Sequence, residues 1–170
     1  MKQISVEKVT LNIGAGTDQA KLERGIKLIG NITGSTPVKT FTKKRIQEWG
    51  LRPGLPIGCK LTLRKNKAVE LLKKLLEAKD NTLQVSNLDG EGNISFGISE
   101  YIDIPGIEYD PEIDIMGLQV CITLKRKGFR IKRRDIKRRE IPRRHRIKKE
   151  EAIDFMKNEF NLRIGEKNDI

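Results

Sequence analysis

Residues 6–13 of the chain read VEKVTLNI, and their side chains alternate between apolar and polar. Val9, Leu11 and Ile13 would lie on one side, and polar residues on the other. Strict alternation predicts a β-strand with one buried face and one open face. The same alternation returns in three further segments of the chain, at 57–64, 94–99 and 118–124.

Helical patterns separate these strands. Asp18 is placed to begin a helix, and Gly34 to end it, around apolar positions at helical spacing: Leu22, Ile26, Ile29 and Ile32. Asn66 is the predicted cap of a second helix, whose inner stripe would be Ala68, Leu72, Leu75 and Leu76. Strands with helices between them predict an α+β fold with a mostly antiparallel sheet, helices on one face and the other face open.

The expected domain organisation is simple. A length of 170 residues fits one domain spanning 1–170. A basic extended loop is expected at about 126–147 and a C-terminal helix at about 149–161.

The open face of the predicted sheet would be small, polar and basic, without aromatic side chains. Proteins that read single-stranded RNA usually place aromatic rings on such a face. Hydroxyl, amide and amino groups suit the riboses and phosphates of an already folded RNA, although a solvated face would look similar. The expected set is Lys8, Thr10, Asn12, Lys60, Thr62, Arg64, Ser95, Ser99, Gln119 and Thr123. A nearby basic cluster, Lys43–Arg45, favours RNA.

The excess positive charge of the chain is local. Residues 125–149 contain 15 Lys or Arg against Asp135 and Glu140, about 15 − 2 = +13, whereas the whole chain is +12. Sparse apolar residues, Gly128 and Pro142 argue against a membrane-surface helix, and arginine favours phosphate. The pattern therefore favours nucleic acid, with a solvated loop or a targeting signal as alternatives.

Residues 49–56 form a Pro- and Gly-rich loop with an apolar tip. Gly50, Pro53, Gly54 and Pro56 favour turns at an exposed site. Such a tip is suited to contact a partner. The alternative is that Trp49 and Leu51 pack back onto the core.

Catalytic chemistry finds little support. The one histidine, His145, lies between two arginines that would disfavour a general base. Asp103, Asp110 and Asp114 could hold a metal in a basic RNA-processing enzyme, but they lie in a Pro-rich turn. We therefore expect no enzyme, no cofactor and no small-molecule substrate.

Cysteines and hydropathy also narrow the class. Cys59 and Cys121 lie far apart in strand-like segments without metal-ligand spacing, so neither zinc nor a disulfide framework is expected. No signal peptide and no long apolar run are evident, which predicts a soluble intracellular protein without a membrane partner.

Three long segments resemble one known family. VEKVTLNIGAG (6–16), the stretch TPVKTFTKKRIQEWGLRPGLPIGCKLTLR (36–64) and the stretch that begins GNISFGISEYIDIPG (92–129) are similar to the large-subunit ribosomal protein that binds 5S ribosomal RNA. This is protein five in the bacterial large-subunit numbering. RRHRIKKEEA (143–152) resembles the archaeal type of the family.

The resemblance implies a structural, cytoplasmic protein in the central protuberance of the large subunit. Its expected partners are 5S ribosomal RNA, large-subunit ribosomal RNA, the peptidyl-site tRNA, neighbouring central-protuberance proteins and, through a bridge, a small-subunit head protein. The family's ribosomal RNA contacts would correspond to Asn12, Gly14, Thr40, Thr42, Lys43, Lys44 and Arg45, with Lys60 as an addition.

Two further sets complete the expected contacts. The tRNA-contacting loop would be Trp49, Gly50, Leu51, Arg52, Pro53, Gly54, Leu55 and Pro56. The basic run departs from the bacterial pattern, and it would add contacts to ribosomal or transfer RNA through Arg130, Lys132, Arg133, Arg134, Lys137, Arg138, Arg139, Arg143, Arg144 and Arg146.

Overall fold

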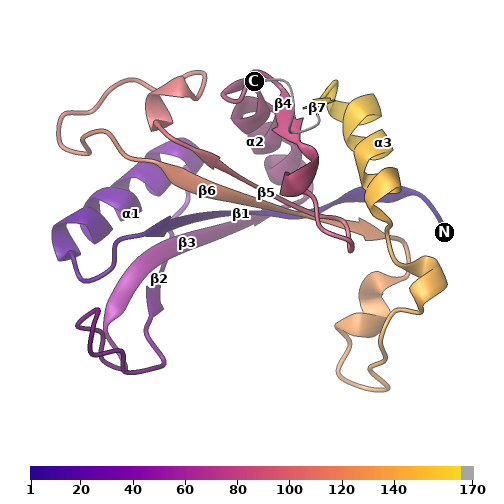
Figure 1. Ribbon diagram of the computed structural model, residues 1–170, viewed down its shortest axis with the longest axis horizontal. Helices are drawn as coiled ribbons and strands as arrows, with labels where there is room; N and C mark the ends of the chain where they lie inside the picture. The colour runs from indigo at the N-terminus through magenta and orange to yellow at the C-terminus, as the bar shows by residue number, and fades with distance from the viewer. Residues whose placement is uncertain (166–170) are drawn as a thin grey trace. The chain divides into compact units, whose positions relative to one another are not determined.

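A computed structural model of the chain describes residues 1–165 and confirms the α+β class. A five-stranded antiparallel sheet has the strand order β2-β3-β1-β6-β5, and β4 pairs with β7 in a separate ribbon (Figure 1). The strands are β1 (Ile4–Gly14), β2 (Val38–Phe41), β3 (Pro56–Arg64), β4 (Thr82–Gln84), β5 (Asn93–Ile98), β6 (Leu118–Arg126) and β7 (Arg163–Gly165). The α-helices are α1 (Gln19–Thr33), α2 (Lys65–Glu77) and α3 (Lys149–Phe160). Short 3-10 turns are η1 (Val85–Asn87), η2 (Tyr101–Asp103), η3 (Phe129–Lys132) and η4 (Arg143–His145).

The chain forms two compact units. Unit 1 comprises Met1–Val9, Arg64–Phe96 and the chain from Cys121 onward; unit 2 comprises Thr10–Leu63 and Gly97–Val120. Alternating burial along the strands appears in both units, as the sequence predicts.

In unit 2, α1 packs closely on the buried face of β1 and β3. A Cβ atom on Gly25 would lie 3.2 Å from Cγ2 of Ile13 and 3.3 Å from Sγ of Cys59. The glycine therefore lets the helix approach the strands closely. The predicted apolar stripe is half right, because Ile26 and Ile32 are only half-buried and the buried positions are Leu22, Gly25, Leu28 and Ile29.

Both ends of α1 are capped as the sequence predicts. The Asp18 side chain accepts a hydrogen bond from the backbone N–H of Lys21 at 3.1 Å. Gly34 adopts the left-handed conformation, with φ of 63°, and its N–H donates to the carbonyl of Gly30.

The acidic segment that precedes β6 is tied to α1. Lys27 forms ion pairs with Asp110, at 3.0 Å, and with Glu112. Arg24 pairs with Asp114 at 3.4 Å. Consequently these carboxylates are occupied by structural partners within unit 2.

In unit 1, α2 buries the predicted stripe of Ala68, Leu72, Leu75 and Leu76, and it adds Leu71. The predicted Asn66 cap is wrong: the helix begins at Lys65, directly after β3, and its N-cap residue Arg64 makes no side-chain capping bond. The N-cap position falls on the last residue of the strand, an arginine, whose side chain has no acceptor for a backbone N–H.

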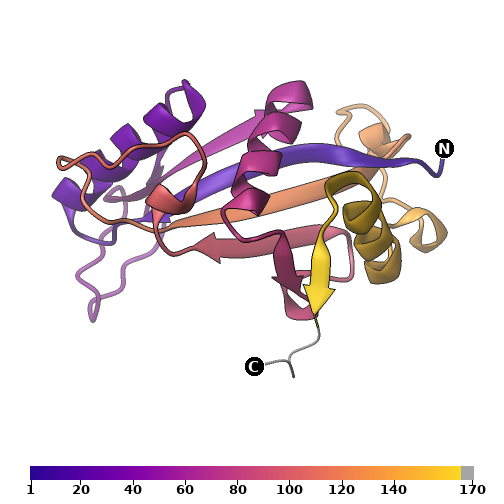
Figure 2. The ribbon, with the colours of Figure 1, turned by 90° about the horizontal axis from the view of Figure 1, so that it is seen from above.

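The last described residues form a strand, β7, that the periodicity of the sequence did not predict. After α3, β7 lies parallel to β4, with Leu83 opposite Ile164 (Figure 2). Each of these strands has three residues, too few for an alternating pattern.

α3 is fixed through a buried arginine. Arg126, only 5% exposed at the end of β6, forms an ion pair with Glu151 at 2.5 Å. Glu151 also accepts the backbone N–H of Lys148, which starts the helix. This N–H, opposed by partial burial and assisted by Arg126, lowers the pKa of Glu151.

Gly25→Val should lower the free energy of unfolding by about 1–3 kcal/mol, because the larger side chain must displace Ile13 or Cys59. Gly30→Ala is the matched control in the same helix, where a Cβ meets nothing within 4 Å. It should stabilise the protein by about 0.5–1 kcal/mol. Urea unfolding of both variants measures these changes, and equal effects would contradict the close-packing argument.

Glu151→Gln should destabilise the protein at neutral pH, and this effect should shrink as the solution is acidified. A carboxylate whose pKa is lowered by folding stabilises the native state above its ordinary pKa of 4.5 and loses that contribution as pH falls through the folded value. Denaturant unfolding of both proteins between neutral pH and about pH 3 measures the difference. A difference that is constant over this range would refute the role of the charge.

Candidate nucleic-acid interface

The loop between β2 and β3 (residues 42–55) is a braced hairpin. Leu55 accepts the backbone N–H and the hydroxyl of Thr42, both at 2.9 Å, and the Gly54 N–H donates to the Thr42 carbonyl at 2.9 Å. Nearer the tip, Ile46 and Leu51 exchange two backbone hydrogen bonds of 3.0 and 2.9 Å. The loop therefore presents its side chains from a defined backbone.

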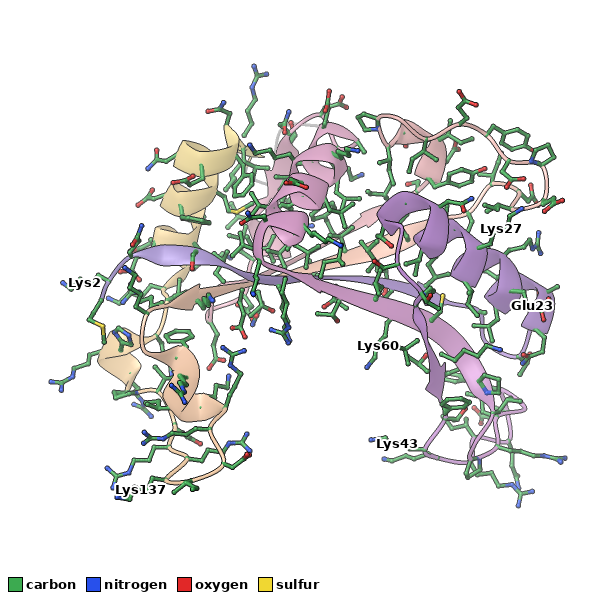
Figure 3. All side chains as sticks on the ribbon, turned by 180° about the vertical axis from the view of Figure 1, so that it is seen from behind. Lys2, Glu23, Lys27, Lys43, Lys60 and Lys137 are labelled. Carbon is green, nitrogen blue, oxygen red and sulfur yellow. The ribbon has the colours of Figure 1, made fainter. Side chains whose placement is uncertain are left out.

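The predicted cationic cluster lies on the first arm of this hairpin loop. Lys43, Lys44 and Arg45 are exposed, and they form no ion pair among residues 1–165. Figure 3 shows Lys43 projecting from the loop and Lys60 projecting from β3 away from α1. These cations are free to meet phosphate.

Each of the two alternatives for residues 49–56, contact with a partner or packing onto the core, holds for a different residue. Trp49 is 67% exposed, whereas Leu51 is only 8% exposed. Leu51 thus supports the loop, and Trp49 with exposed Arg52 is available to a partner. The sequence pattern treated these neighbouring residues alike, because it contains no signal for which one turns inward.

The remaining predicted contacts of unit 2 lie on polar strand positions. Asn12 donates to the Gln119 side chain at 3.0 Å, so its amide is oriented by a neighbouring strand. Gly14 is exposed at the end of β1. Half-buried Thr40 lies opposite Gly58, where a Cβ would be 2.5 Å from the Ile13 carbonyl oxygen. Unit 2 therefore contains all eight predicted ribosomal RNA contacts and the predicted tRNA loop.

The long basic run belongs to unit 1, where residues 127–147 fold into a loop that we call the basic loop (Figure 1). The His145 ring lies edge-on to Phe129 at 5.8 Å, and its Nε2 is 3.0 Å from the Lys127 carbonyl oxygen. Ile141 and Ile147 are buried. Most apolar residues of the basic loop therefore stabilise the fold of the loop.

Two carboxylates outside the basic run hold the loop. Glu7 of β1 pairs with Arg133 at 3.0 Å and with Arg64 at 3.6 Å. Glu91, in the turn before β5, pairs with Arg146 at 3.0 Å. Sequence analysis missed both partners because they are far from the run along the chain.

A metal centre finds no support within residues 1–165. This part of the chain contains no cluster of His, Cys, Asp and Glu that could hold a metal ion. The hydrogen bond from Lys27 lowers the pKa of Asp110, assisted by the backbone N–H of Glu112. Asp110 is thus an ionised structural partner.

A polar strand surface and folded, cation-bearing loops are typical of proteins that bind nucleic acid. Comparison with known protein families identifies the family to which the chain belongs. Residues 1–52 match the model described as ribosomal protein L5, and residues 56–161 match the model of the C-terminus of the same ribosomal family. The chain belongs to the ribosomal protein L5 family.

Archaeal relatives align over almost the entire chain. The chain is 50% identical to the large ribosomal subunit protein uL5 of Sulfolobus acidocaldarius over 166 residues, covering 98% of this chain and 93% of the relative. It is 48% identical to that of Sulfurisphaera tokodaii, covering 98% and 94%. Identity to that of Nanoarchaeum equitans is also 48%, covering 96% and 97%. These matches confirm the expected archaeal type.

Family membership confirms the prediction of a large-subunit ribosomal protein that associates with ribosomal RNA, and it agrees with the prediction that the chain is not an enzyme. Among residues 1–165, no helix has the length and apolar character needed to span a membrane.

Proposed function

We propose that the chain binds 5S ribosomal RNA in the central protuberance through the hairpin loop and polar strand positions of unit 2. The observation that carries this proposal is the cluster Lys43–Arg45, exposed, without ion-pair partners in the described chain and held on a braced backbone. Lysine and arginine there supply affinity by neutralising phosphates and releasing counterions. Asn12, Thr40 and Lys60 set the register on the folded RNA.

The proposal assigns a second role to the tip of the hairpin loop. Exposed Trp49 and Arg52 contact the peptidyl-site tRNA, and buried Leu51 holds them in position. Tryptophan offers a ring face and arginine a planar cation, both of which suit RNA.

Two further contacts complete the proposed function. The basic loop of unit 1 binds large-subunit ribosomal RNA. The chain also contacts neighbouring central-protuberance proteins and helps to form a bridge to a small-subunit head protein. We assign no residues to these protein contacts.

Lys43→Ala combined with Lys44→Ala should weaken binding to 5S ribosomal RNA by about 1–3 kcal/mol, because charged hydrogen bonds to phosphate are lost. Lys73→Ala combined with Lys74→Ala is the matched control, since it removes two adjacent exposed lysines from α2. Filter binding at near-physiological salt compares them, with an unrelated structured RNA of equal length as a reference. Equal affinities of the two variants would refute the assignment of Lys43 and Lys44.

Trp49→Ala combined with Arg52→Ala should weaken retention of peptidyl-site tRNA in reconstituted ribosomes by several-fold, taking the loss of about 1 kcal/mol for one stacking contact as a guide. Binding to isolated 5S ribosomal RNA should remain unchanged. Leu51→Ala, by contrast, should speed amide exchange of the loop, because it removes the buried side chain. A collapse of 5S binding in the Trp49 and Arg52 variant, with the fold intact, would place the tip in the 5S site instead.

A further inference from the structure

A cavity of about 680 Å³ lies within unit 1, between its strands and the basic loop. Residues of β1, β6 and the turn before β5 form one wall, and the basic loop forms the other. Six cations line it: Lys8, Lys132, Arg133, Arg138, Arg139 and Arg146. We call this cavity the groove, and its lining carries an excess of positive charge.

The three carboxylates of the groove divide these cations into two groups. Glu7 pairs with Arg133, and Glu91 and Glu140 both pair with Arg146, at 3.0 and 3.6 Å. Arg133 and Arg146 are thus neutralised within the protein. The other group, Lys8, Lys132, Arg138 and Arg139, forms no ion pair among residues 1–165.

Two hydrogen bonds fix the backbone around Arg138 and Arg139 independently of the side chains of these two residues. The Arg139 N–H donates to the Ile131 carbonyl at 3.1 Å, which closes the basic loop beside η3. The Arg134 side chain donates to the Lys137 carbonyl at 2.9 Å and fixes the turn at the tip, where Figure 3 shows Lys137. Arg138 and Arg139 follow that turn directly and are exposed.

We propose that this groove is an RNA-backbone site in which Lys8, Lys132, Arg138 and Arg139 bind phosphates, while Arg133 and Arg146 are positioning residues that hold the basic loop. The inference rests on the proposed contact of the basic loop with large-subunit ribosomal RNA and names the residues of that contact. Cations that look equivalent in the sequence thus have two different roles, phosphate binding and positioning of the loop.

The other lining groups favour RNA over other polyanions. The Thr123 hydroxyl suits a ribose. A membrane surface would require an exposed apolar face. Within the basic loop, Ile136 is the one large apolar side chain that is strongly exposed, at 79%.

The test is a salt titration of the full chain binding to the long large-subunit ribosomal RNA, without 5S RNA. Arg138→Ala combined with Arg139→Ala should reduce the slope of log affinity against log salt by about 1.5, because each lost phosphate contact contributes about 0.7–0.9. Arg138→Lys combined with Arg139→Lys retains both charges and should retain the slope. The Lys73→Ala and Lys74→Ala variant, with the same charge change on α2, should leave the slope unaltered.

Hydrogen exchange without RNA separates the positioning residues from the binding residues. Arg133→Ala combined with Arg146→Ala should speed amide exchange in the basic loop, because it releases Glu7 and Glu91. Arg138→Ala combined with Arg139→Ala should leave that exchange at the wild-type rate, which shows that its altered slope does not come from unfolding.

A slope in the Arg138 and Arg139 alanine variant equal to that of the α2 control would overturn the inference. So would wild-type exchange in the Arg133 and Arg146 variant. If the Arg138 and Arg139 alanine variant lost binding to phosphatidylserine vesicles but kept the wild-type RNA slope, the groove would be a membrane site and the inference would be wrong. Failure of the 5S assignment is distinguishable, because that assignment depends on the Lys43 and Lys44 variant and on 5S RNA.

Discussion

The structure depends on the burial of one side of the strands β1, β5 and β6, which leaves the other side to polar chemistry. In unit 2 the constraint is tightest at Gly25, where α1 meets Ile13 and Cys59. A larger side chain there must displace one of these two neighbours. Lys60, pointing away from α1, becomes available to a partner for the same geometric reason (Figure 3). Packing on one side and binding on the other are two results of a single alternation.

Charge follows a second constraint, since a dense run of cations repels itself. In the basic loop, carboxylates from elsewhere in unit 1 offset part of this repulsion by pairing with selected arginines: Glu7 with Arg133 and Glu91 with Arg146. Arg126 shows the same arrangement in the core, where Glu151 both pairs with it and starts α3. These few acids neutralise part of a repulsive sequence, and the remaining cations are the ones that we propose bind RNA.

Local patterns predicted the regular elements well. Alternation predicted the main strands, and Asp18 and Gly34 correctly marked the ends of α1. The stripe of α1 was partly wrong because the close approach at Gly25 decides which residues are buried, and a glycine carries no hydrophobic signal. Predictions failed wherever a partner lies far along the chain, as in the β4–β7 pair. The inward turn of Leu51 beside outward Trp49 was equally invisible, because it depends on the hairpin ladder with Ile46.

The hydrogen-bonded ladder of the hairpin loop also determines which molecule changes shape when the complex forms. Ordering a flexible backbone costs roughly 1–2 kcal/mol per residue, and residues 42–55 bear that cost when the protein itself folds. Association therefore loses little conformational entropy on the protein side. In the complex that we propose, the hairpin loop is a pre-organised template, and the RNA adapts its loops to the spacing of the cations.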